Sequence, residues 1–299
     1  MPEEIFKSGF VSIIGRSNVG KSTLLNKLIG EKISIVSDKP QTTRNKILGV
    51  KNFPGIQVVF IDTPGIHKPR HKLNEYMVNT ALSTLDEVDI IFFMVEAGEL
   101  AGPGDRYIMG LLDKITKPVF LLINKIDIVQ KDTLLPQIDE YRRLYKFEEI
   151  FPISALCGDN LDKLNESLKK YLYEGPQYFP EDIVTDQPMR FIASEIIREK
   201  IYQFTYHEIP YSIAVGIEDF QEAEDKNLIL IRAIIYVERD SQKGIIIGKG
   251  GAMLKKVGQL AREELEAIMG IKVFLELWVK VKDKWQSDDT VLKILGYKV

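Results

Sequence analysis

Short apolar runs alternate with longer amphipathic stretches over the first half of the chain. Each run is nearly continuous and is bounded by Gly, Asp, Asn or Pro; the runs lie at residues 10–14, 56–61, 90–95, 119–123 and 150–153. Such runs are typical of strands buried on both faces of a parallel sheet. Helical patterns lie at residues 22–29, 74–85 and 160–172. The pattern therefore predicts an α/β domain with a mostly parallel, doubly wound sheet and a ligand site at the carboxyl ends of its strands.

A different pattern follows a stretch that contains three prolines and no periodicity. We place a linker there, at residues 176–188, between domains at residues 1–175 and 189–299. The second domain is predicted to contain a helix, two strands, a Gly-rich turn, a helix and a strand, at residues 189–207, 211–220, 228–238, 252–269 and 271–281. The last strand alternates apolar and polar residues, which predicts an α+β domain with one buried sheet face. On its other face, Phe274 and Trp278 either stack on bases or pack under a helix.

Composition narrows the class of protein. The chain has 299 residues, 45% hydrophobic and 28% charged, as a globular protein with two domains would have. No apolar run approaches the ~20 residues of a membrane span, and the N-terminus lacks the pattern of a signal peptide. The single cysteine, Cys157, fits a reducing compartment. We therefore expect a cytoplasmic protein.

The charge is unevenly distributed. The net charge is −3, yet residues 181–242 carry 6 Lys and Arg against 13 Asp and Glu, whereas residues 243–299 carry 11 against 7. We therefore expect the last quarter of the chain to bind any polyanion.

A complete G-x-x-x-x-G-K-S motif follows the first strand and precedes a helix. Its backbone N–H groups would surround phosphates, Lys21 would reach the β- and γ-phosphates, and Ser22 would hold Mg²⁺. This P-loop predicts a nucleoside triphosphate site. Its candidate residues are Gly15, Arg16, Ser17, Asn18, Val19, Gly20, Lys21, Ser22 and Thr23.

Two further segments lie at the ends of predicted strands. Asp62-Thr63-Pro64-Gly65 would place a carboxylate beside Mg²⁺ and the Gly65 N–H near the γ-phosphate. In Asn124-Lys125-Ile126-Asp127, the Asp127 carboxylate can accept both N–H donors of guanine, which adenine lacks, and Asn124 can donate to another edge. Lys125 would lie along the base. These residues predict GTP rather than ATP. Ser154-Ala155-Leu156 would add a backbone N–H for the guanine oxygen.

In this order, these segments resemble the translation-factor-like GTPases. The resemblance implies a switch threonine, for which we favour Thr43 over Thr42. The candidate metal-binding residues are then Ser22, Thr43 and Asp62, and the candidate catalytic residues are Lys21, Thr43 and Asn18. The residue after Asp-x-x-Gly is Ile66, where small signalling GTPases carry a water-orienting glutamine. Related GTPases use the Asn at position 18 to hold K⁺; simple hydrogen bonding within the loop is the alternative.

A G-x-x-G loop lies between an apolar stretch and an amphipathic helix in the second domain. In KH domains such a loop holds the backbone of single-stranded nucleic acid, and lysines meet its charge. The element order matches a type II KH domain. The candidate RNA-binding residues are Ile247, Gly248, Lys249, Gly250, Gly251, Lys255 and Lys256.

One P-loop GTPase domain joined to one type II KH domain resembles the Era family across nearly the whole chain. The segments that carry the resemblance are Lys-Pro-Gln-Thr-Thr-Arg, Asp-Thr-Pro-Gly-Ile-His and Ile-Ile-Ile-Gly-Lys-Gly-Gly. It implies slow, Mg²⁺-dependent GTP hydrolysis, binding to the 3′ end of 16S ribosomal RNA and a role in the maturation of the small (30S) ribosomal subunit. It also implies peripheral association with the inner membrane, although the sequence encodes no anchor. We expect a monomer. Ser17 departs from the family, which usually has proline there.

Overall fold

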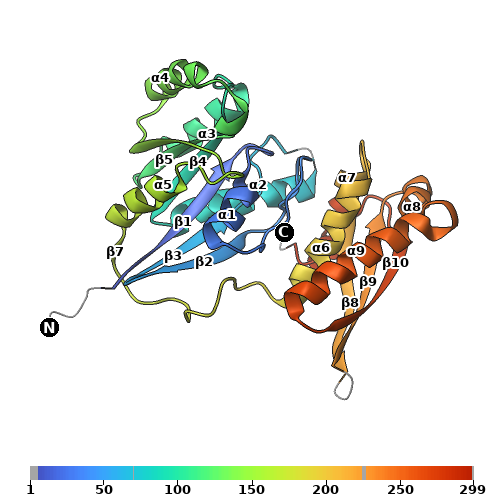
Figure 1. Ribbon diagram of the computed structural model, residues 1–299. Coiled ribbons are helices and arrows are strands. Elements are labelled where there is room, and N and C mark those ends of the chain that lie inside the picture. The colour runs from blue at the N-terminus through green and yellow to red at the C-terminus, as the bar shows by residue number, and fades with distance from the viewer. Residues whose placement is uncertain (1–5, 70, 224–226, 298–299) are drawn as a thin grey trace. The chain divides into compact units, whose positions relative to one another are not determined.

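The computed structural model describes residues 6–69, 71–223 and 227–297. The chain forms two compact units (Figure 1). The first comprises Met1–Val36, Pro40–Lys68 and Met77–Asp186, and the second comprises Ser37–Lys39, Pro69–Tyr76 and Gln187–Val299. Among the described residues, no helix is both long and apolar enough to cross a membrane.

The first unit is built on a mostly parallel sheet in the order β2-β3-β1-β4-β5-β6. Its strands are β1 (Lys7–Gly15), β2 (Ile47–Phe53), β3 (Ile56–Asp62), β4 (Ile90–Glu96), β5 (Val119–Asn124) and β6 (Glu149–Ile153), and β7 (Tyr173–Glu174) pairs with β1. Only β2 and β7 run antiparallel to their neighbours. The predicted α/β class and its five strands are confirmed. The short edge strand β2 was not predicted, because Gly49, Lys51 and Asn52 interrupt its apolar pattern.

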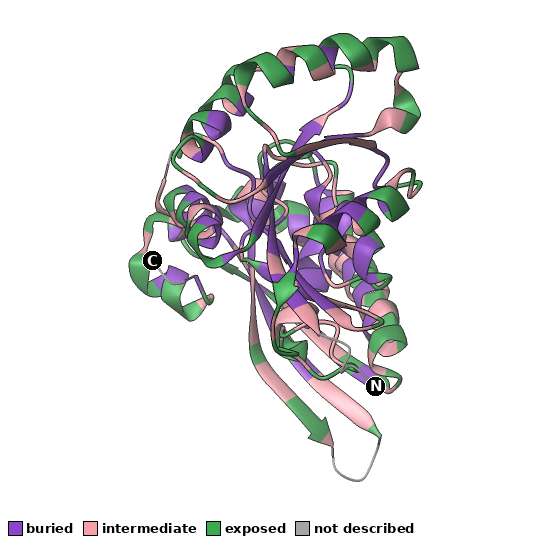
Figure 2. Ribbon diagram, turned by 90° about the vertical axis from the view of Figure 1, so that its left-hand side faces the viewer, coloured by how far each residue is buried: buried purple, intermediate pink, exposed green. Residues whose placement is uncertain are grey.

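Helices cover both faces of this sheet. They are α1 (Lys21–Ile29), α2 (Lys72–Glu87), α3 (Pro103–Leu112), α4 (Leu134–Leu144) and α5 (Leu161–Leu168). One apolar cluster joins α2, α3 and α4 to the alternate strand residues Ile91, Phe93 and Val95. Figure 2 shows buried residues concentrated along the strands. This packing leaves the loops at the carboxyl ends of β1, β3, β5 and β6 to form a site.

The second unit packs helices on one face of a three-stranded sheet in the order β10-β9-β8. Its elements are α6 (Met189–Phe204), α7 (Ile209–Ser212), β8 (Ala214–Ala223), β9 (Leu228–Val237), α8 (Asp240–Ile247), α9 (Ala252–Met269), β10 (Lys272–Val281) and α10 (Asp289–Ile294). The predicted α+β class is confirmed.

Three details of the second unit differ from the prediction. The turn α7 precedes β8, so the strand begins later than expected, and α8 replaces most of the expected Gly-rich turn. Phe274 and Trp278 are 58% and 54% exposed, so the interpretation that they pack under a helix was wrong. They lie on the sheet face opposite the helices.

Residues 175–185, here named the strap, lie along β2 and β3 of the first unit. Gln57 Oε1 accepts hydrogen bonds from the backbone N–H groups of Tyr178 and Phe179, at 2.8 and 2.9 Å. The Val50 N–H donates to the Val184 carbonyl at 2.9 Å. Much of the expected linker is therefore bound to the first unit, and the main segment of the second unit begins at Gln187.

Candidate nucleotide and RNA sites

The P-loop joins β1 to α1, and its backbone carbonyls hold the side chain of its lysine. Gly20 has φ 101°, and a Cβ at this position would lie 2.3 Å from Asn124 Nδ2, so only glycine fits. Lys21 Nζ donates to the carbonyls of Gly15 and Arg16, at 3.3 and 2.8 Å. Burial lowers the pKa of Lys21 to about 8, although the nearby charge of Asp62 opposes this shift. A bound phosphate would stabilise the charged form of this ammonium group in place of the water that burial removes.

Three hydroxyl groups converge on the Asp62 carboxylate, which is fully buried at the end of β3. Its Oδ2 accepts from Ser22 Oγ at 2.6 Å, Ser34 Oγ at 3.0 Å and Thr43 Oγ1 at 3.2 Å. Burial raises the pKa of Asp62, and Lys21 and the hydroxyls oppose the rise. The structure thus brings together the three predicted metal-binding residues. Ser34 was missed, because it lies in a loop without a recognisable motif.

This set of oxygens fits a magnesium ion. Asp62 Oδ1 is buried, and no hydrogen-bond partner is found for it among the described residues. A buried unpaired carboxylate oxygen is costly, and a hydrated cation beside it would remove the cost. No group of three or more His, Cys, Asp or Glu suited to a metal occurs in the described part of the chain. The remaining ligands would accordingly be phosphate oxygens and water, as is usual for Mg²⁺.

The Asp-x-x-Gly segment closes against the P-loop. The Ile66 N–H donates to the Gly15 carbonyl at 3.1 Å, and a Cβ on Gly65 would lie 2.7 Å from the Ser17 nitrogen. The Thr63 hydroxyl donates to the Ile13 carbonyl at 2.8 Å, and Pro64 is buried. The Ile66 side chain is 2% exposed and belongs to the apolar cluster under α2–α4. It therefore offers nothing polar to a water molecule.

The guanine-recognition segments meet behind the P-loop. Asn124 Nδ2 donates to the Val19 carbonyl and Asn124 Oδ1 accepts from the Ala155 N–H, both at 2.8 Å. The amide keeps one N–H for a base. Lys125 has φ 71°, and its ammonium pairs with Glu96 at 2.8 Å. Asp127 is exposed in the 3-10 helix η1 (Ile126–Ile128), where it can meet a ligand.

The other predicted residues of this site differ in their burial. Asn18 is exposed with φ 66°, and Thr23 and Thr42 are half-buried. Ser154 is buried, and its Oγ accepts from the Cys157 N–H at 3.0 Å, which shapes the turn that contains the exposed Leu156. Thr43, unlike Thr42, is 6% exposed and lies 2.8 Å from Ser22 between their hydroxyl oxygens.

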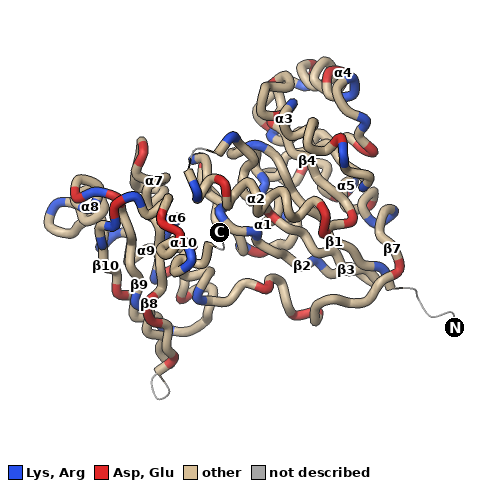
Figure 3. The backbone as a smooth tube through the Cα atoms, turned by 180° about the vertical axis from the view of Figure 1, so that it is seen from behind, with Lys and Arg blue, Asp and Glu red and all other residues tan. Residues whose placement is uncertain are grey.

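A groove of about 520 Å³ opens beside the G-x-x-G loop of the second unit. The loop needs its glycines, since Gly248, Gly250 and Gly251 have φ of 72°, 60° and 78°. Ile247 is half-buried at the end of α8, and Lys249 is exposed. The groove is lined by Gly251, Leu254, Lys255, Gly258, Gln259, Arg262, Leu275 and Leu277. Figure 3 shows Lys and Arg in blue at the α8 end of this unit.

The structure separates the two predicted lysines of α9. Lys255 lines the groove, whereas the Lys256 ammonium lies 4.0 Å from the centre of the Phe204 ring on α6. Gly258 and the apolar residues of the groove were missed by sequence reasoning. The available signal was Gly258 itself, because a glycine inside a helix is unfavourable unless something approaches closely.

Comparisons with known proteins identify the families of both domains. A family model described as a 50S ribosome-binding GTPase matches residues 10–125, and a KH domain model matches residues 208–286. GTPase Era of Geobacter metallireducens is 57% identical over 99% of this chain and 100% of its own length. GTPase Era of Staphylococcus haemolyticus is 54% identical over 97% of each chain. This chain belongs to the Era family of GTPases.

Solved Era structures share the fold. An Era in complex with MgGDPNP and nucleotides 1506–1542 of 16S ribosomal RNA matches with a TM-score of 0.95 and 46% identity, over 98% of this chain and all of the other. A variant of Aquifex aeolicus Era bound to GDP and AlF₄⁻ matches equally well. Like other members of the Era family, the protein is a GTP-hydrolysing enzyme that carries a KH domain.

Proposed function

We propose that this protein is a GTP-driven switch that binds the single-stranded 3′ end of 16S ribosomal RNA during assembly and maturation of the small (30S) ribosomal subunit. The observation that carries the proposal is the groove behind the Gly248–Gly251 loop, in the same chain as a complete guanine nucleotide site. Its floor of Leu275 and Leu277 suits bases, and Lys255 and Arg262 suit phosphates. The solved Era complex with a 16S segment supports this choice of RNA.

In the nucleotide site, Ser22, Thr43 and Asp62 would hold Mg²⁺, which neutralises charge on the β- and γ-phosphates. The proximity of Thr43 to Ser22 supports Thr43, rather than Thr42, as the switch threonine. Lys21 would add its charge at the same phosphates, and Asn124 and Asp127 would read the base. The buried Asp62 and its hydroxyl donors support this assignment.

The RNA assignment is tested by reversing charge at the G-x-x-G loop and in the groove beside it. Gly250 has φ 60° and is left unchanged, because a side chain there would strain the loop. Lys249→Glu with Lys255→Glu should weaken binding to a 16S 3′-end oligonucleotide by at least about tenfold, because phosphate contacts supply much of the affinity. GTP affinity should not change. Lys293→Glu, at an exposed position of α10, is the matched control. An unchanged dissociation constant in the double variant would refute the groove as the RNA site.

We further propose that K⁺ assists hydrolysis beside Asn18. The buried Ile66 supports this proposal, because it stands where small signalling GTPases have a water-orienting glutamine. The negative charge that develops in the transition state must then be stabilised by another group. Single-turnover rates should be higher in K⁺ than in Na⁺, and Asn18→Ala should abolish the difference. Equal rates in both salts would leave Asn18 with hydrogen bonding in the loop as its role.

We also propose a cytoplasmic, monomeric protein that associates peripherally with the inner membrane. The single, exposed cysteine supports a reducing compartment. Membrane association is supported only by the family resemblance. Sedimentation with anionic lipid vesicles tests it, and a protein that stays entirely in the supernatant would contradict it.

A further inference from the structure

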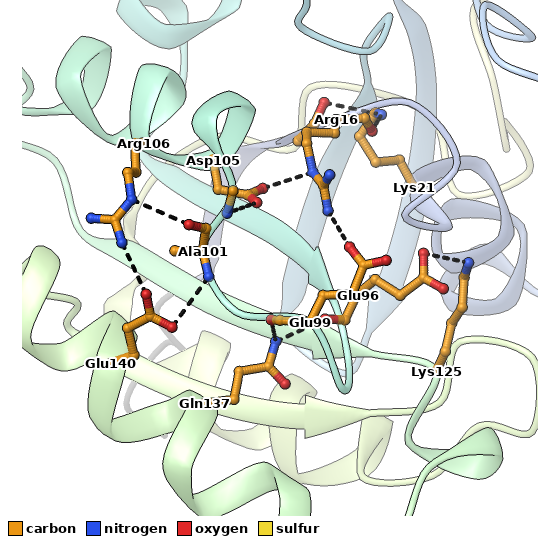
Figure 4. Close-up of polar contacts among 12 residues, drawn as sticks. Arg16, Lys21, Glu96, Glu99, Ala101, Asp105, Arg106, Lys125, Gln137 and Glu140 are labelled. Carbon is orange, nitrogen blue, oxygen red and sulfur yellow. Dashed lines mark hydrogen bonds and ion pairs between the residues drawn. The ribbon is translucent and has the colours of Figure 1, made fainter.

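The Arg16 side chain turns away from the phosphate site into a group of acidic residues (Figure 4). Arg16 Nη2 lies 2.7 Å from Glu99 Oε2, and Arg16 Nε lies 3.0 Å from Asp105 Oδ1. A Cβ on Gly104 would lie 2.8 Å from Arg16 Cδ, so glycine leaves the room that this side chain needs. Arg16 is therefore packed into the start of α3 rather than toward a ligand.

The two carboxylates differ in their surroundings. The Glu99 side chain is 56% exposed, and an exposed ion pair contributes little. Asp105 is fully buried and pairs with Arg16 by charge, while its Oδ2 accepts a hydrogen bond from the Gly102 N–H at 3.1 Å, at the N-terminus of α3. Burial raises the pKa of Asp105 and the Arg16 guanidinium opposes this rise. The same carboxylate, together with burial, raises the pKa of Tyr141. Glu99 thus supplies the exposed hydrogen bond to Arg16, and Asp105 is its buried ion-pair partner.

The anchor itself is fixed by α4. Gln137 Nε2 donates to the carbonyls of Glu96 and Glu99, at 2.8 and 2.7 Å, and Gln137 Oε1 accepts from the Gly98 N–H at 3.0 Å. Glu140 pairs with Arg106 at 3.0 Å and accepts from the Ala101 N–H at 3.3 Å. The loop that carries Glu99 and leads into α3, where Asp105 lies, is consequently held by α4 from Glu96 to Ala101.

The backbone of Arg16 connects this anchor to the reaction. Its carbonyl accepts from Lys21 Nζ at 2.8 Å, the shorter of the two backbone hydrogen bonds of this ammonium, so the position of the Arg16 peptide group contributes to where the ammonium lies. The catalytic value of such a charge depends on its placement at the developing charge of the transition state. Ground-state nucleotide binding also uses the P-loop N–H groups and the guanine contacts, so it depends less on Lys21 alone.

We propose that Asp105 is a positioning residue for GTP hydrolysis, which anchors Arg16 and, through the Arg16 carbonyl, fixes Lys21 at the β- and γ-phosphates. Removal of Asp105 should therefore lower kcat more than it weakens nucleotide binding.

The test compares Asp105→Asn with the unchanged protein in steady-state hydrolysis of MgGTP, using the full chain. Asn keeps an acceptor for the Gly102 N–H but loses the charge. We expect kcat to fall about tenfold, because small misplacements of a catalytic group are costly, while the dissociation constant for GDP changes less than twofold. Asp113→Asn, at the exposed C-terminal end of α3, is the matched control and should behave as the unchanged protein.

A second pair of variants separates positioning from stability. Arg16→Gln leaves the buried Asp105 carboxylate unpaired, so its melting temperature should fall along with kcat. Adding Asp105→Asn removes that charge and should restore most of the melting temperature without restoring kcat.

Three results would overturn the proposal. The first is an unchanged kcat in Asp105→Asn. The second is a parallel loss of kcat, GDP affinity and melting temperature, which indicates general loosening of the P-loop. The third is recovery of kcat together with stability in the double variant.

Discussion

The Asn124 side chain makes two hydrogen bonds within the protein and is also a residue that we propose to contact the guanine base. Its hydrogen bonds to Val19 and Ala155 join the P-loop to the loop after β6. A single N–H remains for the base, and one neutral hydrogen bond contributes modestly. If these residues read the base as we propose, discrimination between bases would depend mainly on Asp127, whose exposed carboxylate is able to accept two hydrogen bonds.

Replacing Asp127 with asparagine should therefore change the base preference. An amide can donate to the additional carbonyl of xanthine but no longer accepts both guanine donors. We expect Asp127→Asn to weaken GTP by about 2–3 kcal/mol and to bind xanthosine triphosphate more tightly than GTP. Competition titrations measure both affinities, with Asp132→Asn as an exposed control. Undiminished GTP affinity would remove Asp127 from base recognition.

At the scale of residues, the sequence predicts which side chains meet where a motif specifies both the residue types and their spacing. Ser22 and Asp62 meet as expected, because both follow strands that end at one edge of the sheet. Ser34 and Asp105 could not be found this way. Their importance depends on burial beside residues 28 and 89 positions away, which periodicity does not encode.

At the scale of elements, the extent of burial decided which helices and strands could be predicted from the hydrophobic pattern of the sequence. β4 and β5 are buried along almost their whole length, so they appear as continuous apolar runs. α3 and α4 were not predicted, because each buries only a narrow side and begins beside Gly or Pro residues. α8 was taken for part of a turn because Gly244 lies in its middle.

One side chain, that of Gln57, makes three hydrogen bonds to the backbone of the strap. Gln57 is fully buried and also donates to the Phe179 carbonyl at 2.8 Å. Gln57→Leu would leave these backbone groups of the strap without partners, at a cost of about 2–4 kcal/mol. We expect a lower midpoint of thermal unfolding by circular dichroism, and no change in Gln130→Leu, an exposed control. An unaltered midpoint would show that the strap is held by its other contacts.

For the whole molecule, the apolar cores support two separately folded domains. The apolar cluster of the second unit lies entirely between residues 192 and 279. We expect a fragment of residues 187–299 to fold alone, and to bind the 16S oligonucleotide with nearly the affinity of the full chain. Urea unfolding followed by circular dichroism tests the first point. A gradual, non-cooperative loss of signal would mean that the second domain needs the first.

The strap also has a consequence for association between molecules. β2 is the edge strand of its sheet, and the strap takes up the Val50 N–H and the Leu48 carbonyl along that edge. An uncovered edge strand is a template on which a second chain can add a strand of its own. A first-domain fragment that ends at residue 174 should therefore self-associate with rising concentration, whereas one that ends at residue 186 should remain monodisperse in light scattering. We therefore expect the strap to prevent edge-to-edge aggregation of the first domain.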